Sequence, residues 1–241
     1  MELHVSKTAE EVLSALAEYF ISRAEQAIER RGRFAVALSG GSSPKKLYQL
    51  LASPAYRERV AWAQVYFFFG DERNVPHTSP DSNYLMAKKA LFEPLAIRPA
   101  QVFAVDTRLA PAEAAAQYGV DVEEFFGEQE ARFDLVLLGL GDNAHTASLF
   151  PNTPVLHDQT VSVQEVWLPV EQVFRITFTA PLINQARAVA FLVYGAGKAE
   201  AVHQILELPC DVDRYPAQLI ELVGQPVEWF LDEAAAAQVN H

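Results

Sequence analysis

The residues best suited to chemistry follow stretches that are typical of buried strands. The stretch 133–138 is the most apolar of these, and it leads through Gly139-Leu140-Gly141 to His145. An imidazole titrates near neutral pH, so a histidine in a glycine turn just after a strand is suited to act as a general base. A structural histidine is the alternative interpretation, and this segment alone does not decide between the two.

A second polar segment, 70–76, follows the strand-like stretch Val65–Phe69. Arg73 can bind a phosphate group through its forked guanidinium, and Asp71 can orient a hydroxyl group or a catalytic histidine. The alternative is a solvated loop in which the acidic side chains pair with Arg73.

The loop Ser39-Gly40-Gly41-Ser42-Ser43-Pro44 follows the apolar stretch Phe34–Leu38 and precedes a helix. Its two glycines let the backbone approach an anion, while the hydroxyls and the helix start offer hydrogen bonds to phosphate oxygens. A glycine turn with a serine cap is the plainer interpretation. The loop lacks both a third spaced glycine and a Gly-Lys-Ser/Thr sequence, so nucleotide binding is not predicted.

Two further cations lie beside strand-like stretches. Arg175 opens the stretch 175–178, and Lys198 follows Val189–Val193. A lysine at a helix start opposes the helix dipole, so either a bound phosphate or full exposure to solvent must account for it. An anion-binding loop, an Asp-Arg pair, a histidine and a lysine thus converge on strand ends, and together they indicate a site for an anionic, hydroxylated ligand.

The elements that must position these residues alternate between apolar strands and amphipathic helices. We expect strands over Phe34–Leu38, Val65–Phe69, 133–138, 175–178, 188–193 and 227–231, and helices over 8–31, 45–51, 81–92, Pro111–Phe126 and 232–239. This alternation predicts one α/β domain over residues 1–241, with a mostly parallel, Rossmann-like sheet flanked by helices. In such sheets the ligand crevice lies beyond the carboxyl ends of the strands.

Composition narrows the classes of partner. The chain holds 31 acidic and 19 basic residues and carries a formal net charge of −12. Nucleic acids and anionic membranes are therefore not expected as partners, because both bind basic surfaces. Cys210 is the only cysteine, which excludes an internal disulfide, and no histidine pair has zinc-site spacing, so no metal is predicted. A secretion signal and a membrane-spanning stretch are also missing from the sequence, and a cytoplasmic location is expected.

Taken in order, these segments resemble the 6-phosphogluconolactonase family over nearly the whole chain. The shared segments are Ser39-Gly40-Gly41-Ser42, Asp71-Glu72-Arg73, Ser82-Asn83-Tyr84, Gly139-Leu140-Gly141, His145-Thr146-Ala147-Ser148-Leu149-Phe150-Pro151, Arg175-Ile176-Thr177 and Gly195-Ala196-Gly197-Lys198. The resemblance implies a fold like that of glucosamine-6-phosphate isomerase, and hydrolysis of the phosphosugar 6-phospho-D-glucono-1,5-lactone without a cofactor or metal. It implies catalytic roles for His145, Asp71 and Asn143, and substrate binding by Ser39, Gly40, Gly41, Ser42, Arg73, Asn83, Arg175 and Lys198.

The chain departs from the family pattern beside the histidine. In the family that the chain resembles, this segment usually reads Gly-x-Gly-Pro-Asp-Gly-His, whereas this chain has Gly141-Asp142-Asn143-Ala144-His145. If the family Asp orients the histidine, Asn143 supplies only a neutral hydrogen bond, and Asp142 is one residue away to take over. A catalytically impaired sugar-phosphate binding protein of the same fold is therefore an alternative function.

Two other enzyme classes share parts of the pattern. The related sugar-phosphate deaminases have a pattern like Asp-Glu-Tyr where this chain has Asp71-Glu72-Arg73. This difference favours the lactonase family over the deaminases. A serine hydrolase that uses Ser42, His145 and Asp71 is also conceivable, although the serine loop lacks a Gly-x-Ser-x-Gly elbow. The oligomeric state stays open.

Overall fold

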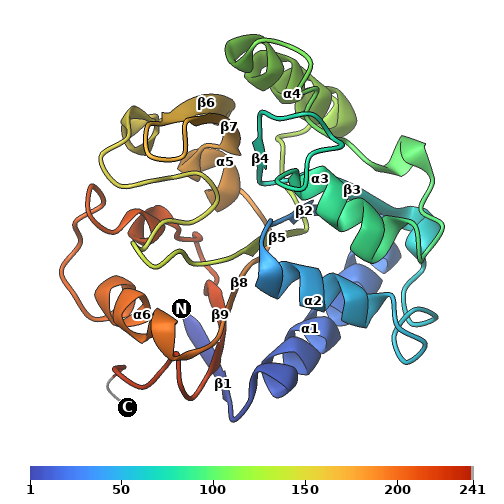
Figure 1. Ribbon diagram of the computed structural model, residues 1–241. Helices are drawn as coiled ribbons and strands as arrows, with labels where there is room; N and C mark the ends of the chain where they lie inside the picture. The colour runs from blue at the N-terminus through green and yellow to red at the C-terminus, as the bar shows by residue number, and fades with distance from the viewer. Residues whose placement is uncertain (240–241) are drawn as a thin grey trace.

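The computed structural model describes residues 1–239, and helices alternate with strands along most of this chain (Figure 1). The helices are α1 (Ala9–Arg31), α2 (Ser42–Leu51), α3 (Asn83–Ala87), α4 (Pro111–Phe126), α5 (Ala180–Asn184) and α6 (Ala199–Leu206). The strands are β1 (Glu2–Ser6), β2 (Phe34–Leu38), β3 (Val65–Phe69), β4 (Asp71–Arg73), β5 (Leu135–Leu138), β6 (Val163–Leu168), β7 (Val173–Phe178), β8 (Val189–Val193) and β9 (Glu228–Asp232).

Six of the strands form one parallel sheet in the order β1-β9-β8-β5-β2-β3. The inner strands β2, β5 and β8 are buried at every residue, which explains why their sequences are continuously apolar and do not alternate. The predicted α/β fold with a mostly parallel sheet flanked by helices is therefore confirmed.

Two hydrophobic cores cover the two faces of this sheet. On one face, α1 and α2 pack on inward-facing side chains such as Val36 and Leu38. On the other face, α4, α6 and a second, smaller sheet cover side chains such as Ala37 and Leu138. Figure 1 shows α1 and α2 grouped beside each other, with α4 next to the small sheet in a separate layer. With both faces covered, the strand ends are the natural place for a ligand site.

The longest helix, α1, is fixed at both ends by its own sequence. Thr8 and Glu11 form a capping box, and the N–H of Gly32, at a φ of 72°, donates to the carbonyl of Ile28. None of the helices in residues 1–239 combines the length and the apolar sequence that crossing a membrane requires.

The second sheet, β4-β7-β6, is antiparallel throughout. The predicted strand 175–178 lies in β7 and so belongs to this sheet and not to the parallel one. Neither β4 nor β6 is predicted from the sequence, because β4 is three polar residues and the apolar residues of β6 do not alternate cleanly. The edge strand β1 is missed for a similar reason, since most of its residues are exposed.

Two predicted helices begin at other residues than expected. Helix α2 starts at Ser42, so that Pro44 is its third residue. The helix predicted over 81–92 starts at Asn83, after a cap by Ser82, and continues from Lys88 as a π-helical turn.

The helix predicted over 232–239 is wrong. Asp232 ends β9, and its carboxylate accepts hydrogen bonds from the N–H groups of Gly195 and Ala235. Residues 233–239 form turns instead, although their sequence is rich in alanine. The side-chain hydrogen bonds of Asp232 fix this segment against β8, which overrides its helix propensity.

The strand order reverses direction between β2 and β5. From β2 the chain continues to β3 on one side, whereas β5 lies on the other side and leads toward β8 and β9. Connections that leave two neighbouring strands in opposite directions open a crevice at the carboxyl ends of those strands. The loops Ser39-Gly40-Gly41 and Gly139-Leu140-Gly141 border this crevice.

Candidate active site

A cavity of about 260 Å³ occupies this reversal point. It is lined by Ser39, Gly40, Gly41, Asp71, Arg73, Asn83, Gly139, Leu140, Gly141, His145, Thr146, Ala147, Phe150, Glu171 and Arg175. All of the predicted site residues except Ser42, Asn143 and Lys198 are in this lining. The fold therefore assembles segments from both halves of the chain around one small space.

The two arginines of the cavity are paired across the ladder between β4 and β7. Arg73 lies in register with Arg175, and Asp71 lies in register with Thr177. Residues two apart on a strand point to the same face, so Asp71 shares a face with both arginines. Like charges directly opposite each other destabilise a sheet, and an anion between them relieves the repulsion. This pairing is the arrangement expected of an anion site.

Arg175 is held by two carboxylates although its side chain is only 8% exposed. Its Nη1 lies 3.6 Å from Oδ2 of Asp71, and its Nη2 forms an ion pair with Glu171. Asp71 is fixed in turn by the hydroxyl of Ser148, which donates to Oδ2 at 2.8 Å. A buried guanidinium needs such counter-charges, because an unpaired buried charge is strongly destabilising.

Arg73 is positioned by Asn83. Its Nη1 donates to Oδ1 of Asn83 at 2.7 Å and to the carbonyl of Asp81 at 2.8 Å, while Nδ2 of Asn83 donates to the carbonyl of Asp71 at 2.9 Å. Gly40 makes this packing possible, because a Cβ at that position would lie 2.0 Å from Oδ1 of Asn83. Asn83 is predicted to bind substrate, and in the structure its side chain orients Arg73.

Glu72 anchors the same segment from inside the protein. Its carboxylate accepts hydrogen bonds from the N–H groups of Arg73, Asn83 and Tyr84 and from the hydroxyl of Ser82. Burial raises the pKa of this carboxyl, and the backbone hydrogen bonds oppose the rise. Glu72 therefore holds β4 against the start of α3, and it does not line the cavity.

The hydrogen bond between His145 and Asn143 determines which ring nitrogen of the histidine carries the proton. Its Nδ1 lies 2.5 Å from Oδ1 of Asn143. An amide oxygen only accepts hydrogen bonds, so Nδ1 carries the proton and Nε2 is left with the lone pair that a base needs. The ring also stacks on Phe150 with the ring centroids 3.8 Å apart. Asn143 therefore selects the tautomer from outside the cavity lining.

Burial lowers the pKa of His145 to about 4. The negative charge of Asp71 opposes this shift, whereas Arg175 and Lys198 add to it. The imidazole is thus neutral at pH 7 by a wide margin. The expectation of titration near neutrality does not fit this environment, because sequence spacing contains no information about how far the fold shields the partly buried ring from water.

Two small residues shape the turn that carries His145. A Cβ on Gly141 would lie 2.0 Å from Nδ1 of His145, so only glycine lets the ring sit against this backbone. Ala144 has a φ of 60°, a left-handed conformation that costs an alanine roughly 1–2 kcal/mol. The pattern that the sequence resembles has glycine at that position, where a positive φ carries no such cost.

Lys198 and Asp142 form an ion pair with each other outside the cavity lining. Asp142 is 83% exposed and is bonded to Lys198, while Asn143 is the residue that contacts the imidazole. The suggestion that Asp142 replaces the family Asp is therefore wrong. Lys198 acts on His145 through its charge.

Ser42 is exposed at the first turn of α2, and among the described residues no hydrogen bond joins it to His145 or Asp71. The structure thus offers no support for a serine triad. Ser39, Gly40 and Gly41, by contrast, line the cavity where α2 begins, so the positive end of that helix faces the ligand space.

Two residues of the cavity lining are not predicted as site residues from the sequence: Glu171, which pairs with Arg175, and Phe150, which stacks on His145. Glu171 lies in the connection between β6 and β7, where no hairpin is predicted. Its position four residues before Arg175 is the one available signal, and that spacing does not bring two side chains together on an extended strand.

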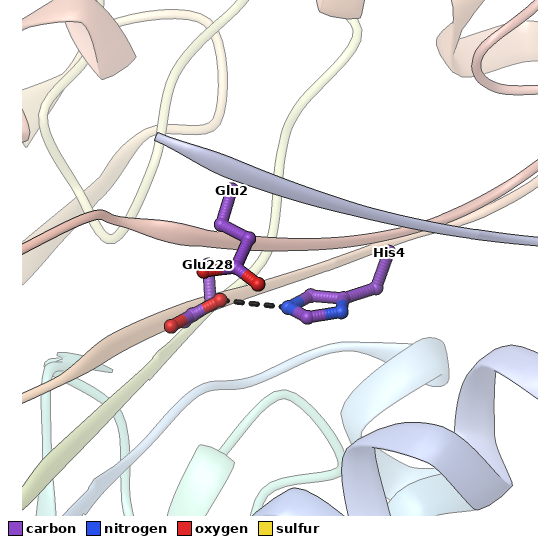
Figure 2. Close-up of side chains that lie close together, drawn as sticks. All are labelled: Glu2, His4 and Glu228. Atoms are coloured by element: carbon purple, nitrogen blue, oxygen red, sulfur yellow. Dashed lines mark hydrogen bonds and ion pairs between the residues drawn. The ribbon is translucent and has the colours of Figure 1, made fainter.

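A separate group of titratable residues lies at the other end of the sheet. Within residues 1–239, Glu2, His4 and Glu228 are the group whose ligand atoms lie close enough to share a metal ion. Figure 2 shows the His4 ring directed at Glu228, and Nε2 lies 2.7 Å from Oε2 of that residue. Glu2 and Glu228 are the first residues of β1 and β9, whereas the cavity lies beyond strand carboxyl ends. The trio joins the edge strand to β9, and independence of the site from metals stays a prediction.

The close contact at Gly141 predicts that Gly141→Ala moves the imidazole. The displaced ring loses its burial, so the pKa of His145 should rise from about 4 toward the ordinary value of roughly 6.5. Titration of the His145 Cε1–H resonance by NMR measures this change. Gly139→Ala is the matched control, because its Cβ would meet only Ser39 Oγ at 3.8 Å. Equal pKa values in the two variants would contradict the assigned packing.

The contact between Asn143 and the ring predicts that Asn143→Asp raises the pKa of His145. A carboxylate at this distance stabilises the imidazolium and should raise the pKa by about 1–3 units. Asp142→Asn removes a neighbouring charge that is bonded to Lys198 and should change the pKa by less than about half a unit. The same NMR titration measures both variants, and a larger effect of Asp142→Asn would mean that Asp142 faces the ring.

Comparison with known proteins agrees with this geometry. Residues 7–229 match the family model described as glucosamine-6-phosphate isomerases/6-phosphogluconolactonase. A 6-phosphogluconolactonase of Nostoc is 39% identical over 229 residues, 92% of each chain, and one of Synechocystis is 41% identical over 225 residues, covering 91% of this chain and 90% of that one. The crystal structure of 6-phosphogluconolactonase from Leishmania guyanensis superimposes with a TM-score of 0.87 at 26% identity, covering 100% of this chain and 99% of the other. The chain therefore belongs to the glucosamine-6-phosphate isomerase/6-phosphogluconolactonase family.

Proposed function

We propose that this protein hydrolyses 6-phospho-D-glucono-1,5-lactone to 6-phospho-D-gluconate, the lactonase step of the oxidative pentose phosphate pathway. The observation that carries the proposal is the pairing of Arg73 with Arg175 across one ladder, on the wall of a cavity that also holds His145. A phosphate group would neutralise the charge of the two arginines. A neutral imidazole can accept a proton from the water molecule that hydrolyses an ester. The Nostoc and Synechocystis relatives bear the name of this activity, which supports the same substrate.

In the proposed reaction, Nε2 of His145 accepts a proton from a water molecule while the water oxygen attacks C1 of the lactone. The carbonyl oxygen becomes an oxyanion in the tetrahedral intermediate. The C1–O5 bond then breaks, and the imidazolium returns the proton to the departing ring oxygen. His145 thus ends in its starting state, and no other reactant is consumed.

The oxyanion needs donors that are already in place. Backbone N–H groups of the loops Ser39-Gly40-Gly41 and Gly139-Leu140-Gly141 border the cavity, and the start of α2 adds its positive end. Removal of one such donor typically costs about 3 kcal/mol of transition-state stabilisation. Asp71 supports the proton transfer to His145, because its negative charge opposes the lowering of the His145 pKa by burial.

The alternative of an impaired binding protein has no observation in its favour. It rests on Asn143 in place of the family Asp, yet the amide oxygen still selects the Nδ1-protonated tautomer. We further propose that residues 1–241 act as one domain, which the family match over 7–229 supports. A cytoplasmic location is proposed on the presence of a single, exposed cysteine.

The role of His145 predicts both a rate and a pH profile. His145→Ala should lower kcat by roughly 10²–10⁴, the usual loss for a general base. In the parent, kcat at saturating lactone should be level from about pH 6 to 8 and should fall as the pH drops toward the His145 pKa of about 4, because protonation removes the base. The measurement is a lactonase assay with spontaneous hydrolysis subtracted, and His203→Ala is the control. Full activity of His145→Ala would remove the imidazole from the mechanism.

The anion site predicts selective losses of affinity. Arg73→Ala and Arg175→Ala should each weaken the binding of 6-phosphogluconate by about 1.5–3 kcal/mol, roughly 10- to 150-fold, and should barely affect unphosphorylated gluconate. Lys198→Ala should have a smaller effect, because Lys198 lies outside the lining. Isothermal titration calorimetry measures all three, with the exposed Arg108→Ala as control. If neither cavity arginine separates the two ligands, the phosphate binds elsewhere.

A further inference from the structure

The guanidinium of Arg175 has one edge that is only half used. Nη2 and Nε lie on the same edge and form the fork that binds a bidentate oxyanion. Glu171 occupies Nη2, whereas Nε is buried and has no hydrogen-bond partner within the protein. A buried donor without an acceptor is costly, so this edge favours an anion that spans both nitrogens.

The two carboxylates on Arg175 differ in how firmly they are held. Asp71 is 7% exposed, lies in β4 and accepts a hydrogen bond from Ser148. Glu171 is 43% exposed, and among the described residues Arg175 is its only hydrogen-bond or ion-pair partner. Asp71 is therefore a fixed counter-ion, whereas Glu171 can leave Arg175 without breaking any other hydrogen bond or ion pair of its own.

The backbone around Glu171 also permits movement of this side chain. The residue lies in the short connection between β6 and β7, next to Gln172, whose φ is 52°. Val170, on its other side, is 97% exposed. Residues 169–172 are all exposed, so a different rotamer of Glu171 can reach solvent while the hairpin stays as it is.

Charge balance gives the Glu171 side chain a reason to move. The cavity is lined by two carboxylates, Asp71 and Glu171, and by two guanidiniums, Arg73 and Arg175. A phosphate monoester brings a charge of about −1.5 to −2 at pH 7. Phosphate and Glu171 then compete for the same edge of Arg175. The carboxylate of Glu171 reaches only Nη2, whereas a phosphate group brings the larger charge and a third oxygen to an edge where Nε is still unpaired.

We propose that Glu171 is an exchangeable counter-ion of the phosphate site: it neutralises Arg175 when no phosphate is bound and is displaced by the phosphate group of the ligand. The strength of the Glu171–Arg175 pair then sets a threshold that a monoanionic or poorly shaped ligand does not pass. Glu171 is thus a specificity-determining residue, and this inference rests on the proposed phosphosugar substrate.

The test is the affinity of Glu171→Gln for three probes at fixed ionic strength: 6-phosphogluconate, inorganic phosphate and gluconate. The amide keeps the size of the side chain and removes its charge. Both phosphate-containing probes should then bind about fivefold more tightly, the most that a partly exposed ion pair is typically worth, while gluconate binding should not change. Glu165→Gln is the matched control, because Glu165 lies on β6 of the same hairpin and outside the cavity lining. It removes the same charge and should leave all three affinities as they are.

Three outcomes would overturn the proposal. Unchanged phosphate affinity in Glu171→Gln would show that the carboxylate does not compete, and weaker affinity would show that Glu171 instead holds Arg175 in its binding position. Equal tightening in Glu165→Gln would assign the effect to the net charge of the protein. The proposed function is tested separately by lactone hydrolysis in the parent. If the parent does not hydrolyse the lactone but Glu171→Gln binds phosphate more tightly, the proposed function fails and the counter-ion role of Glu171 stands. If the parent hydrolyses the lactone but Glu171→Gln does not bind phosphate more tightly, the counter-ion role fails and the proposed function stands.

Discussion

Repulsion between Arg73 and Arg175 is the constraint around which the rest of the site is arranged. The β4–β7 ladder sets these two residues opposite each other, and both line the same cavity, in a chain whose net charge is −12. Asp71 and Glu171 neutralise Arg175, and Asn83 orients Arg73. The small antiparallel sheet makes this arrangement, because its β4–β7 register places Arg73 directly opposite Arg175. An acidic protein thereby keeps a local positive site for an anionic ligand.

The base is governed by a different physical effect, the cost of burying a charge. His145 sits against Gly141 and Phe150, and desolvation holds its pKa near 4. A base of low pKa is a weak proton acceptor, yet it is fully available at neutral pH. A lactone is already an activated ester, so a weak, always-available base in the correct tautomer suits this substrate. Asn143 supplies the tautomer without the charge that an aspartate would add.

Much of this design is readable from the sequence. Buried parallel strands are continuously apolar, so Phe34–Leu38 and Val65–Phe69 are found with correct bounds, and the residues that follow them are the cavity residues. The small sheet is not readable in this way, because three polar residues suffice for β4 once β7 lies beside them. Glu171 is missed with it. The depth of His145 and the partner of Asp142 depend on tertiary packing, which spacing along the chain does not encode.

The most direct test of the account is a crystal structure of the protein with 6-phosphogluconate bound. The account predicts that the phosphate group lies between the guanidiniums of Arg73 and Arg175, with Nε of Arg175 as one of its donors and the C1 carboxylate beside Nε2 of His145. A phosphate bound at Lys198 and away from both arginines, or a sugar turned so that C1 is remote from His145, would contradict it.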